Sequence, residues 1–227
     1  MPQTIEGLVF DLDGTLIDSA PDLHVAANLL LAEAGRAPLS LPAVIGMIGD
    51  GMPALIERAF AATGSPPAGA DMRHLARRFL EIYQDPSRDH LTRVYPGVPE
   101  TLDRLRRGGL RLAVCTNKME AAAVAVLRDL GLADRFDAVV GSDRVPARKP
   151  DPAHVLAALE RIAVPPSRAA MVGDGPNDVA AARGAGLPVV ILSYGYSRVP
   201  AERLGADRVI ARFSDLPAAL ASLGLLT

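Results

Sequence analysis

GLVFDLDGTLIDSAPD, residues 7–22, begins with an apolar run that leads directly into two acidic side chains, Asp11 and Asp13. An uninterrupted apolar run is typical of a strand that is covered on both faces, as strands are in a parallel sheet. Burying a charge is costly unless the charge is paired or binds a cation. Two carboxylates at the end of such a strand therefore predict a site where cations offset their charge.

Further apolar runs of the same kind follow along the chain, at 110–117, 136–143, 169–174, 188–193 and, more weakly, 207–211. Helical patterns alternate with them, over 99–109, 119–131, 151–162 and 177–186. Regular alternation of strands and helices predicts right-handed βαβ units. We therefore expect an α/β fold whose core is a doubly wound, Rossmann-like parallel sheet.

The segment between residues 18 and 93 contains no convincing strand but three amphipathic helical patterns, over 21–35, 52–64 and 70–85. Structureless loops of this length are rare in compact domains. We expect 18–93 to form a smaller, all-helical domain, inserted into a core domain made of 1–17 and 94–227. Ser19 and Asp22 are expected to form a capping box at the start of the first helix, and Pro42 to interrupt the helical pattern.

Composition excludes several functional classes. The chain has 227 residues, 24 basic against 26 acidic side chains, 4% aromatic residues and no Trp. These values give no basic surface or stacking platform for nucleic acid and no attraction to an anionic membrane. No signal peptide or membrane-spanning run is expected. The single cysteine, Cys115, lies in an apolar run and is interpreted as a core residue, which fits a reducing, cytoplasmic location.

In open parallel sheets, ligands bind beyond the carboxyl ends of the strands. The polar side chains expected there are Asp11, Asp13, Thr116, Asn117, Asp174 and Asp178, with Lys149 in a loop before a helix. Clustered carboxylates favour a hard divalent cation, and Mg²⁺ suits a few carboxylates together with water and phosphate. A carboxylate beside that cation can attack phosphorus, and a second can protonate the leaving oxygen and later activate water. These residue types predict phosphoryl chemistry.

Four motifs carry a resemblance to a known family: DLDGTLIDS (11–19), the TN pair (116–117), the lysine of RKPDP (148–152) and GDGPND (173–178). In order and spacing they resemble the motifs of the haloacid dehalogenase superfamily across nearly the whole chain. The inserted helices resemble the type 1 cap of that superfamily. DSAPDL (18–23) and the stretch 44–60 are similar to phosphoglycolate phosphatases, although sugar-phosphate phosphatases share much of this likeness.

The resemblance implies a role for each acidic residue of the site. Asp11 matches the nucleophile, and Asp13 matches the general acid/base. Asp at position 13, where dehalogenases have Tyr, indicates a phosphatase or phosphomutase. The side chains of Asp11 and Asp174, with the backbone carbonyl of Asp13, match the ligands of Mg²⁺. Asp178 matches a carboxylate that orients the metal site or the catalytic lysine.

The resemblance also assigns the phosphoryl group to Thr116 and the backbone of Asn117, with Lys149 neutralising its charge. Read alone, Lys149 would most often be a surface loop residue, and Thr116 and Asn117 could be simple turn residues. The glycine-containing stretch 46–54 is a candidate substrate loop, although an ordinary turn between helices explains it almost as well.

The expected function is a Mg²⁺-dependent phosphomonoesterase that forms an aspartyl-phosphate, with 2-phosphoglycolate as the favoured substrate. A sugar-phosphate phosphatase or a phosphomutase is the nearest alternative, and a non-catalytic metabolite-binding relative is a third. A nicotinamide-dependent oxidoreductase is disfavoured because no GxGxxG follows the first strand. The expected partner is a small phosphorylated metabolite, without nucleic acid or membrane, and the chain is expected to be a monomer or a homodimer.

Overall fold

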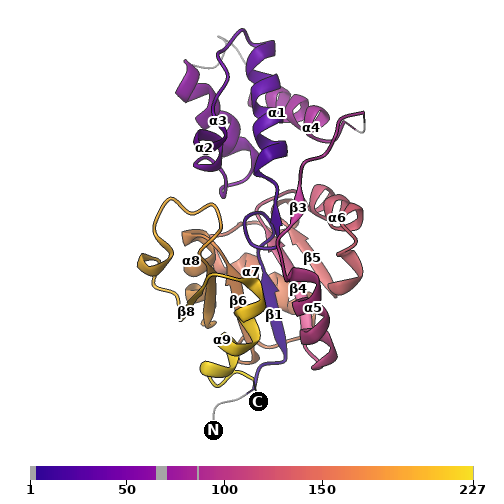
Figure 1. Cartoon of the computed structure of the whole chain (residues 1–227), viewed down its shortest axis with the longest axis vertical. Helices are drawn as coiled ribbons and strands as arrows, with labels where there is room; N and C mark the ends of the chain where they lie inside the picture. The colour runs from indigo at the N-terminus through magenta and orange to yellow at the C-terminus, as the bar shows by residue number, and fades with distance from the viewer. Residues whose placement is uncertain (1–3, 65–70, 86, 227) are drawn as a thin grey trace. The chain divides into compact units, whose positions relative to one another are not determined.

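A computed structural model describes residues 4–64, 71–85 and 87–226. The chain divides into two compact units, each with its own apolar interior (Figure 1). The core unit combines Met1–Ile17 with Val94–Thr227, and the helical unit is Asp18–Arg93. Two short strands, β2 (Ile17–Asp18) and β3 (Arg93–Val94), pair with each other where the chain passes from one unit to the other.

The core unit contains a six-stranded sheet in the order β5-β4-β1-β6-β7-β8, with every pairing between neighbours parallel. Its strands are β1 (Gly7–Phe10), β4 (Arg111–Thr116), β5 (Ala138–Gly141), β6 (Ala169–Gly173), β7 (Val189–Leu192) and β8 (Arg208–Ile210). This is the doubly wound order, in which the chain starts in the middle and winds outward in both directions. The predicted fold class is confirmed, and each predicted apolar run contains one of these strands.

Helices cover both faces of this sheet (Figure 1). The helices on one face are α5 (Val98–Arg107), α6 (Glu120–Asp129) and α9 (Leu216–Ser222), and those on the other are α7 (Pro152–Arg161) and α8 (Pro176–Gly184). Side chains of β1 alternate between the two interiors, with Leu8 and Phe10 in one and Val9 in the other. All three are fully buried, which explains why the strand is apolar throughout.

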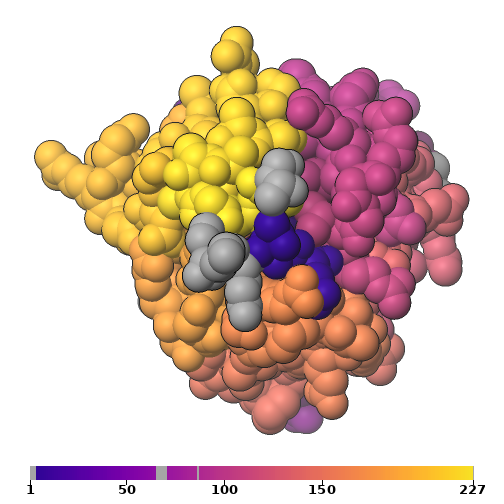
Figure 2. Space-filling view, turned by 90° about the horizontal axis from the view of Figure 1, so that it is seen from below, coloured from indigo at the N-terminus to yellow at the C-terminus, as the bar shows by residue number. Residues whose placement is uncertain are grey.

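The start of β1 is enclosed by later parts of the chain (Figure 2). Seen from below, the indigo residues at the beginning of the strand lie among the yellow C-terminal segment, the orange segment that leads into β6 and the magenta α5 region. The backbone N–H of Ile5 donates to the carbonyl of Leu225 at 2.9 Å. Short 3₁₀ turns of the core unit lie at Ala133–Arg135, Ser142–Arg144, Pro166–Arg168, Ala201–Arg203 and Phe213–Asp215.

The helical unit consists of α1 (Ala20–Glu33), α2 (Leu41–Ile45), α3 (Met52–Thr63) and α4 (Met72–Tyr83) around a shared apolar interior. The three expected helices are present, while Ala70, at the start of the third pattern, lies outside the described residues. The short helix α2 was not expected because Pro42 was interpreted as an interruption. Pro42 instead lies in the first turn of α2, where a missing backbone N–H costs nothing.

The expected capping box at the start of α1 is wrong. Ser19 occupies the N-cap position without a side-chain cap hydrogen bond. The carboxylate of Asp22 instead accepts hydrogen bonds from the backbone N–H of Leu91 at 2.9 Å, and from the N–H and hydroxyl of Thr92 at 2.8 and 2.5 Å. Burial opposes ionisation, but these donors outweigh it and hold the pKa of Asp22 below its usual value. Asp22 thus ties the beginning of the helical unit to its end.

Membrane-crossing helices are not found in the described part of the chain. No helix there combines the length and the apolar character that a bilayer span requires.

Candidate active site

The carboxyl ends of β1, β4 and β6 meet at one edge of the core sheet. The parallel register pairs Phe10 of β1 with Val172 of β6. Asp11 and Asp174 therefore leave neighbouring strands at nearly the same level, and Thr116 is the last residue of β4 on the other side of β1. The structure brings the predicted polar residues of these strand ends together, as the doubly wound topology requires.

Lys149 reaches this edge from the loop before α7 and is almost fully buried, with 2% of its surface exposed. Its ammonium lies 2.8 Å from Asp11 Oδ1 and 2.7 Å from Asp178 Oδ1. Burial alone would lower the pKa of Lys149, but these two carboxylates outweigh it and hold the pKa above its usual value. The Asn117 side-chain amide donates to the Lys149 carbonyl at 3.0 Å, and the Lys149 N–H donates to His154 Nδ1 at 3.3 Å. Lys149 is therefore a fixed, permanently charged group.

Three carboxylates gather at this edge of the sheet, and two of them, Asp11 and Asp178, contact Lys149. One oxygen from each of Asp11, Asp174 and Asp178 lies within 4.8 Å of the others. Burial, opposed by Lys149 and reinforced by the charge of Asp178, raises the pKa of Asp11 to about 7. Burial and the other two carboxylates also raise the pKa of Asp174. Such a cluster of oxygen ligands suits a hard divalent cation, whose charge would stabilise the ionised carboxylates. The residues present fit a divalent metal site.

Within this cluster, Asp178 is held by the protein itself. Asp178 Oδ1 accepts from Lys149, and Oδ2 accepts from the backbone N–H groups of Asp174 at 3.1 Å and Gly175 at 3.0 Å. Asp178 lies in the first turn of α8 and accepts from the backbone N–H of Gly175, the N-cap residue of that helix. Through these three hydrogen bonds, Asp178 connects Lys149 to the loop that carries Asp174.

Asp174 is held by groups from two other segments. Asp174 Oδ1 accepts from the Thr15 hydroxyl at 2.9 Å, and Oδ2 accepts from the backbone N–H of Tyr196 at 2.7 Å. The chain must also pass close to this carboxylate: Gly14 has φ +87°, and a Cβ there would lie 2.6 Å from Asp174 Oδ2. A Cβ on Gly195 would overlap the Asp174 side chain as well. Because glycine has no Cβ, the chain can pass at these two positions without displacing the Asp174 side chain.

Residues 5–186 match the family model of the haloacid dehalogenase-like hydrolases. The chain belongs to this family. It is 47% identical over 221 residues to the phosphoglycolate phosphatase of Rhodospirillum rubrum, covering 95% of this chain and 90% of that protein. It is 44% identical over 216 residues to the phosphoglycolate phosphatase of Caulobacter vibrioides, covering 95% and 91%. The crystal structure of a predicted phosphoglycolate phosphatase from Haemophilus somnus superimposes with a TM-score of 0.86 at 31% identity, covering 94% of this chain and 97% of that one.

In this haloacid dehalogenase-like hydrolase, Asp13 lies beside the acidic cluster and has a cation of its own. The ammonium of Lys118 lies 3.1 Å from Asp13 Oδ1 and 3.2 Å from Oδ2. Thr116, which is buried, accepts a hydrogen bond on its hydroxyl oxygen from the Lys118 N–H at 3.2 Å. The site of this hydrolase thus contains two ammonium groups, each paired with one carboxylate of the DLD motif.

Sequence reasoning missed several residues of this site. Lys118 directly follows the TN pair, and Thr15 lies within the motif DLDGTLIDS. Their closeness in sequence to predicted site residues is the signal that could have identified both. Tyr196 acts through its backbone N–H from the loop after β7, and no motif marks it. His154 is not among the residues expected at the site, but its ring accepts a hydrogen bond from the backbone N–H of Lys149.

Cys115 is a core residue, as expected. It is fully buried in the interior that α7 and α8 cover. Burial raises the pKa of its thiol to about 12, so the thiol stays protonated at neutral pH. This hydrolase therefore does not have a cysteine nucleophile at position 115.

Proposed function

We propose that this hydrolase is a Mg²⁺-dependent phosphomonoesterase that converts 2-phosphoglycolate to glycolate and phosphate. The observation that carries the chemistry is the buried ammonium of Lys149, within 2.8 Å of Asp11 and at the edge of the three-carboxylate cluster. The choice of substrate is supported by the likeness to phosphoglycolate phosphatases over 95% of the chain.

Asp11 is the proposed nucleophile. Its carboxylate oxygen attacks phosphorus, the bond from phosphorus to the leaving oxygen breaks, and an aspartyl-phosphate forms. Asp13 donates a proton to the leaving oxygen, so that glycolate departs as an alcohol. Asp13 then takes a proton from a water molecule that attacks phosphorus, which releases phosphate and restores the Asp11 carboxylate.

The proposed cradle for the phosphoryl group consists of Lys149, the hydroxyl of Thr116 and the backbone of Asn117. The fixed ammonium of Lys149 offsets the charge on the phosphoryl oxygens without having to move, which favours the transition state. Asp178 serves as the positioning carboxylate because it holds Lys149 at 2.7 Å. Asn117 has a second task, since its side chain holds the loop of Lys149.

The side chains of Asp11 and Asp174 and the backbone carbonyl of Asp13 are the proposed ligands of Mg²⁺. When bound, the cation supplies positive charge that polarises the phosphoryl group and keeps the carboxylates ionised. Hard oxygen ligands from few side chains suit Mg²⁺, which retains several water ligands.

The helical unit, residues 18–93, is proposed to act as a cap that excludes bulk water from the reaction. Its stretch 46–54, between α2 and the first turn of α3, is the candidate for recognising the substrate. An ion pair between Arg58 and Asp50 gives this stretch a fixed shape, and the Arg58 guanidinium also donates to the Met47 carbonyl at 2.9 Å.

Phosphate release from a panel of esters tests the proposal. The panel contains 2-phosphoglycolate and several sugar phosphates, each measured with Mg²⁺ and with a chelator. We expect release that depends on Mg²⁺ and is fastest with 2-phosphoglycolate. A preference for a sugar phosphate would keep the mechanism and overturn the substrate, whereas silence across the panel would contradict the phosphatase assignment.

A further inference from the structure

Lysine is rare in this chain and is concentrated at the site. Of the 24 basic residues, 22 are arginines and two are lysines, Lys118 and Lys149. Both lysines form ion pairs with the DLD motif, Lys149 with Asp11 and Lys118 with Asp13. A lysine ammonium is a compact point charge, whereas the arginine guanidinium is a broad planar fork. The two compact cations of the chain thus lie beside the two carboxylates of the DLD motif.

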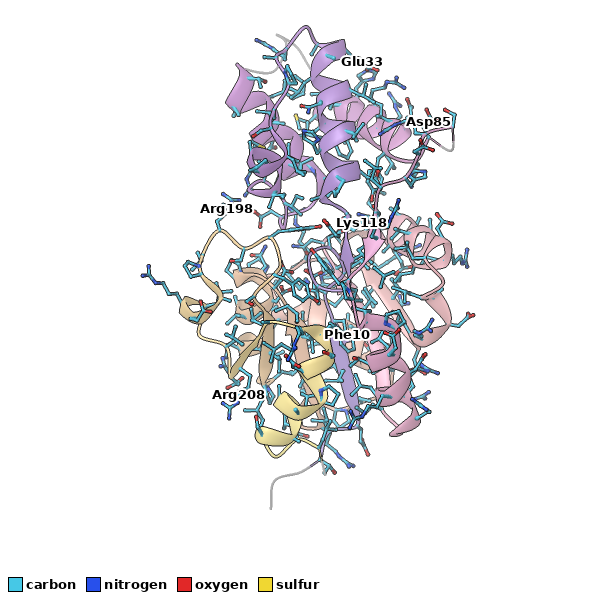
Figure 3. The ribbon with its side chains drawn as sticks, in the orientation of Figure 1. Phe10, Glu33, Asp85, Lys118, Arg198 and Arg208 are labelled. Carbon is cyan, nitrogen blue, oxygen red and sulfur yellow. The ribbon has the colours of Figure 1, made fainter. Side chains whose placement is uncertain are left out.

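Lys118 is held firmly in place at the end of β4. Its backbone N–H donates to the Thr116 hydroxyl oxygen at 3.2 Å, and its carbonyl accepts from the Ser142 N–H at 3.0 Å. Its side chain is only 9% exposed. Figure 3 labels Lys118 at the upper end of the core unit. Anchoring the backbone on both sides directs the ammonium toward Asp13.

The two lysines face different parts of a bound phosphate ester. Lys149 touches Asp11, the proposed nucleophile, and therefore faces the phosphoryl group. Lys118 touches Asp13, which must come within about 3 Å of the leaving oxygen to protonate it. The Lys118 ammonium, at 3.1 Å from Asp13, is therefore within reach of groups attached to that oxygen. In 2-phosphoglycolate, one methylene separates this oxygen from a carboxylate.

We propose that Lys118 binds the carboxylate of the leaving group and thereby selects substrates whose leaving group is anionic. This inference rests on the proposed function, since it assigns the contact to the side of the site where Asp13 protonates the leaving oxygen. A second carboxylate next to Asp13 would be repelled without a cation between them. Lys118 supplies that cation by sharing its ammonium between Asp13 and the substrate.

Two substrates and two variants test this role. 2-Phosphoglycolate and ethyl phosphate have the same two-carbon leaving group with and without the carboxylate. Lys118→Met removes the ammonium but keeps the side-chain length. Arg128→Met, on the exposed surface of α6, removes a positive charge away from the site and serves as the matched control. The assay is steady-state phosphate release with saturating Mg²⁺, giving kcat/KM for each pair.

Lys118→Met should lower kcat/KM for 2-phosphoglycolate about 10- to 100-fold more than for ethyl phosphate, the effect of losing a hydrogen bond to a charged group. Arg128→Met should keep the wild-type ratio. Equal losses on both substrates would mean that Lys118 serves Asp13 alone, which overturns the inference but leaves the phosphatase proposal intact. A wild-type preference for another ester with an anionic leaving group, lost in Lys118→Met, would support Lys118 while overturning 2-phosphoglycolate as substrate. Silence on every ester would overturn both.

Discussion

Acidification from pH 7.5 to pH 5.0 should reveal how strongly the fold holds the His154 imidazole neutral. His154 is fully buried, with Nε2 donating to the Val140 carbonyl at 3.2 Å and Nδ1 accepting from the Lys149 N–H at 3.3 Å. The hydrogen-bonding partners assign the proton to Nε2. Burial, together with the charge of Lys149, lowers the pKa of His154 from 6.5 to about 4.

The size of the effect follows from this difference in pKa. Between pH 6.5 and pH 4 the unfolded chain binds a proton at His154 that the folded protein excludes, so acid favours unfolding over this range. Since one pKa unit corresponds to about 1.4 kcal/mol, the full difference approaches ~3 kcal/mol. At pH 5.0 this effect lowers the free energy of unfolding by about 2 kcal/mol, whereas above pH 7 the decrease is negligible.

Urea unfolding at both pH values, in the presence of a chelator, measures this loss. His154→Gln provides an amide donor for the Val140 carbonyl but does not titrate. The decrease in unfolding free energy between pH 7.5 and pH 5.0 should be about 2 kcal/mol larger in the wild type than in this variant. His74→Gln, at an exposed position of α4, should behave like the wild type. Equal decreases in wild type and His154→Gln would refute the reasoning.

Three further substitutions probe the site and the helical unit. Asp11→Asn should lower turnover by at least about 10⁴-fold with an unchanged circular dichroism spectrum, since an amide cannot replace the carboxylate nucleophile; more than 1% residual activity would exclude that role. Mg²⁺ at about 100 times its Kd should stabilise the wild type by about 2.7 kcal/mol in thermal unfolding, and a shift of the same size in Asp174→Asn would contradict its assignment as a ligand. Asp22→Asn should cost about 1–3 kcal/mol of unfolding free energy at neutral pH, because the charged acceptor of three hydrogen bonds is lost. That cost should shrink in acid, where the wild-type Asp22 becomes protonated at its lowered pKa, and a cost unchanged down to pH 2 would argue against the depressed pKa.

The core sheet could be predicted because its strands are covered on both faces. Runs such as Leu8–Phe10 are apolar at every position, and their alternation with helical patterns determines a parallel topology. Helix α2 could not be predicted in this way, because its five residues are too few to show a helical period and include Pro42. The predicted capping box at Ser19 is absent because the Asp22 carboxylate accepts hydrogen bonds from Leu91 and Thr92 instead. Sequence spacing does not reveal a contact between residues so far apart in the chain.

The site was predictable where its residues follow strands. Asp11 and Asp174 lie one residue beyond neighbouring strands, so topology alone brings them together, and their catalytic roles stay predictions. The contacts of Tyr196 and His154 were not predictable, because each depends on where a loop backbone settles against the site. Lys118 had a signal that motif reading ignores, namely the scarcity of lysine in a chain rich in arginine.

The central position of β1 has a consequence for how the protein is made. β1 emerges from the ribosome before its neighbour β6, because Val172 follows its partner Phe10 by 162 residues. At about 5–20 residues per second, synthesis leaves one edge of β1 without its partner for roughly 8–32 s. During that interval the helical unit can already fold, since its closing hydrogen bonds to Asp22 need nothing beyond Thr92. The helical insertion can therefore form before β6 completes the site of Asp11 and Asp13, which follow β1.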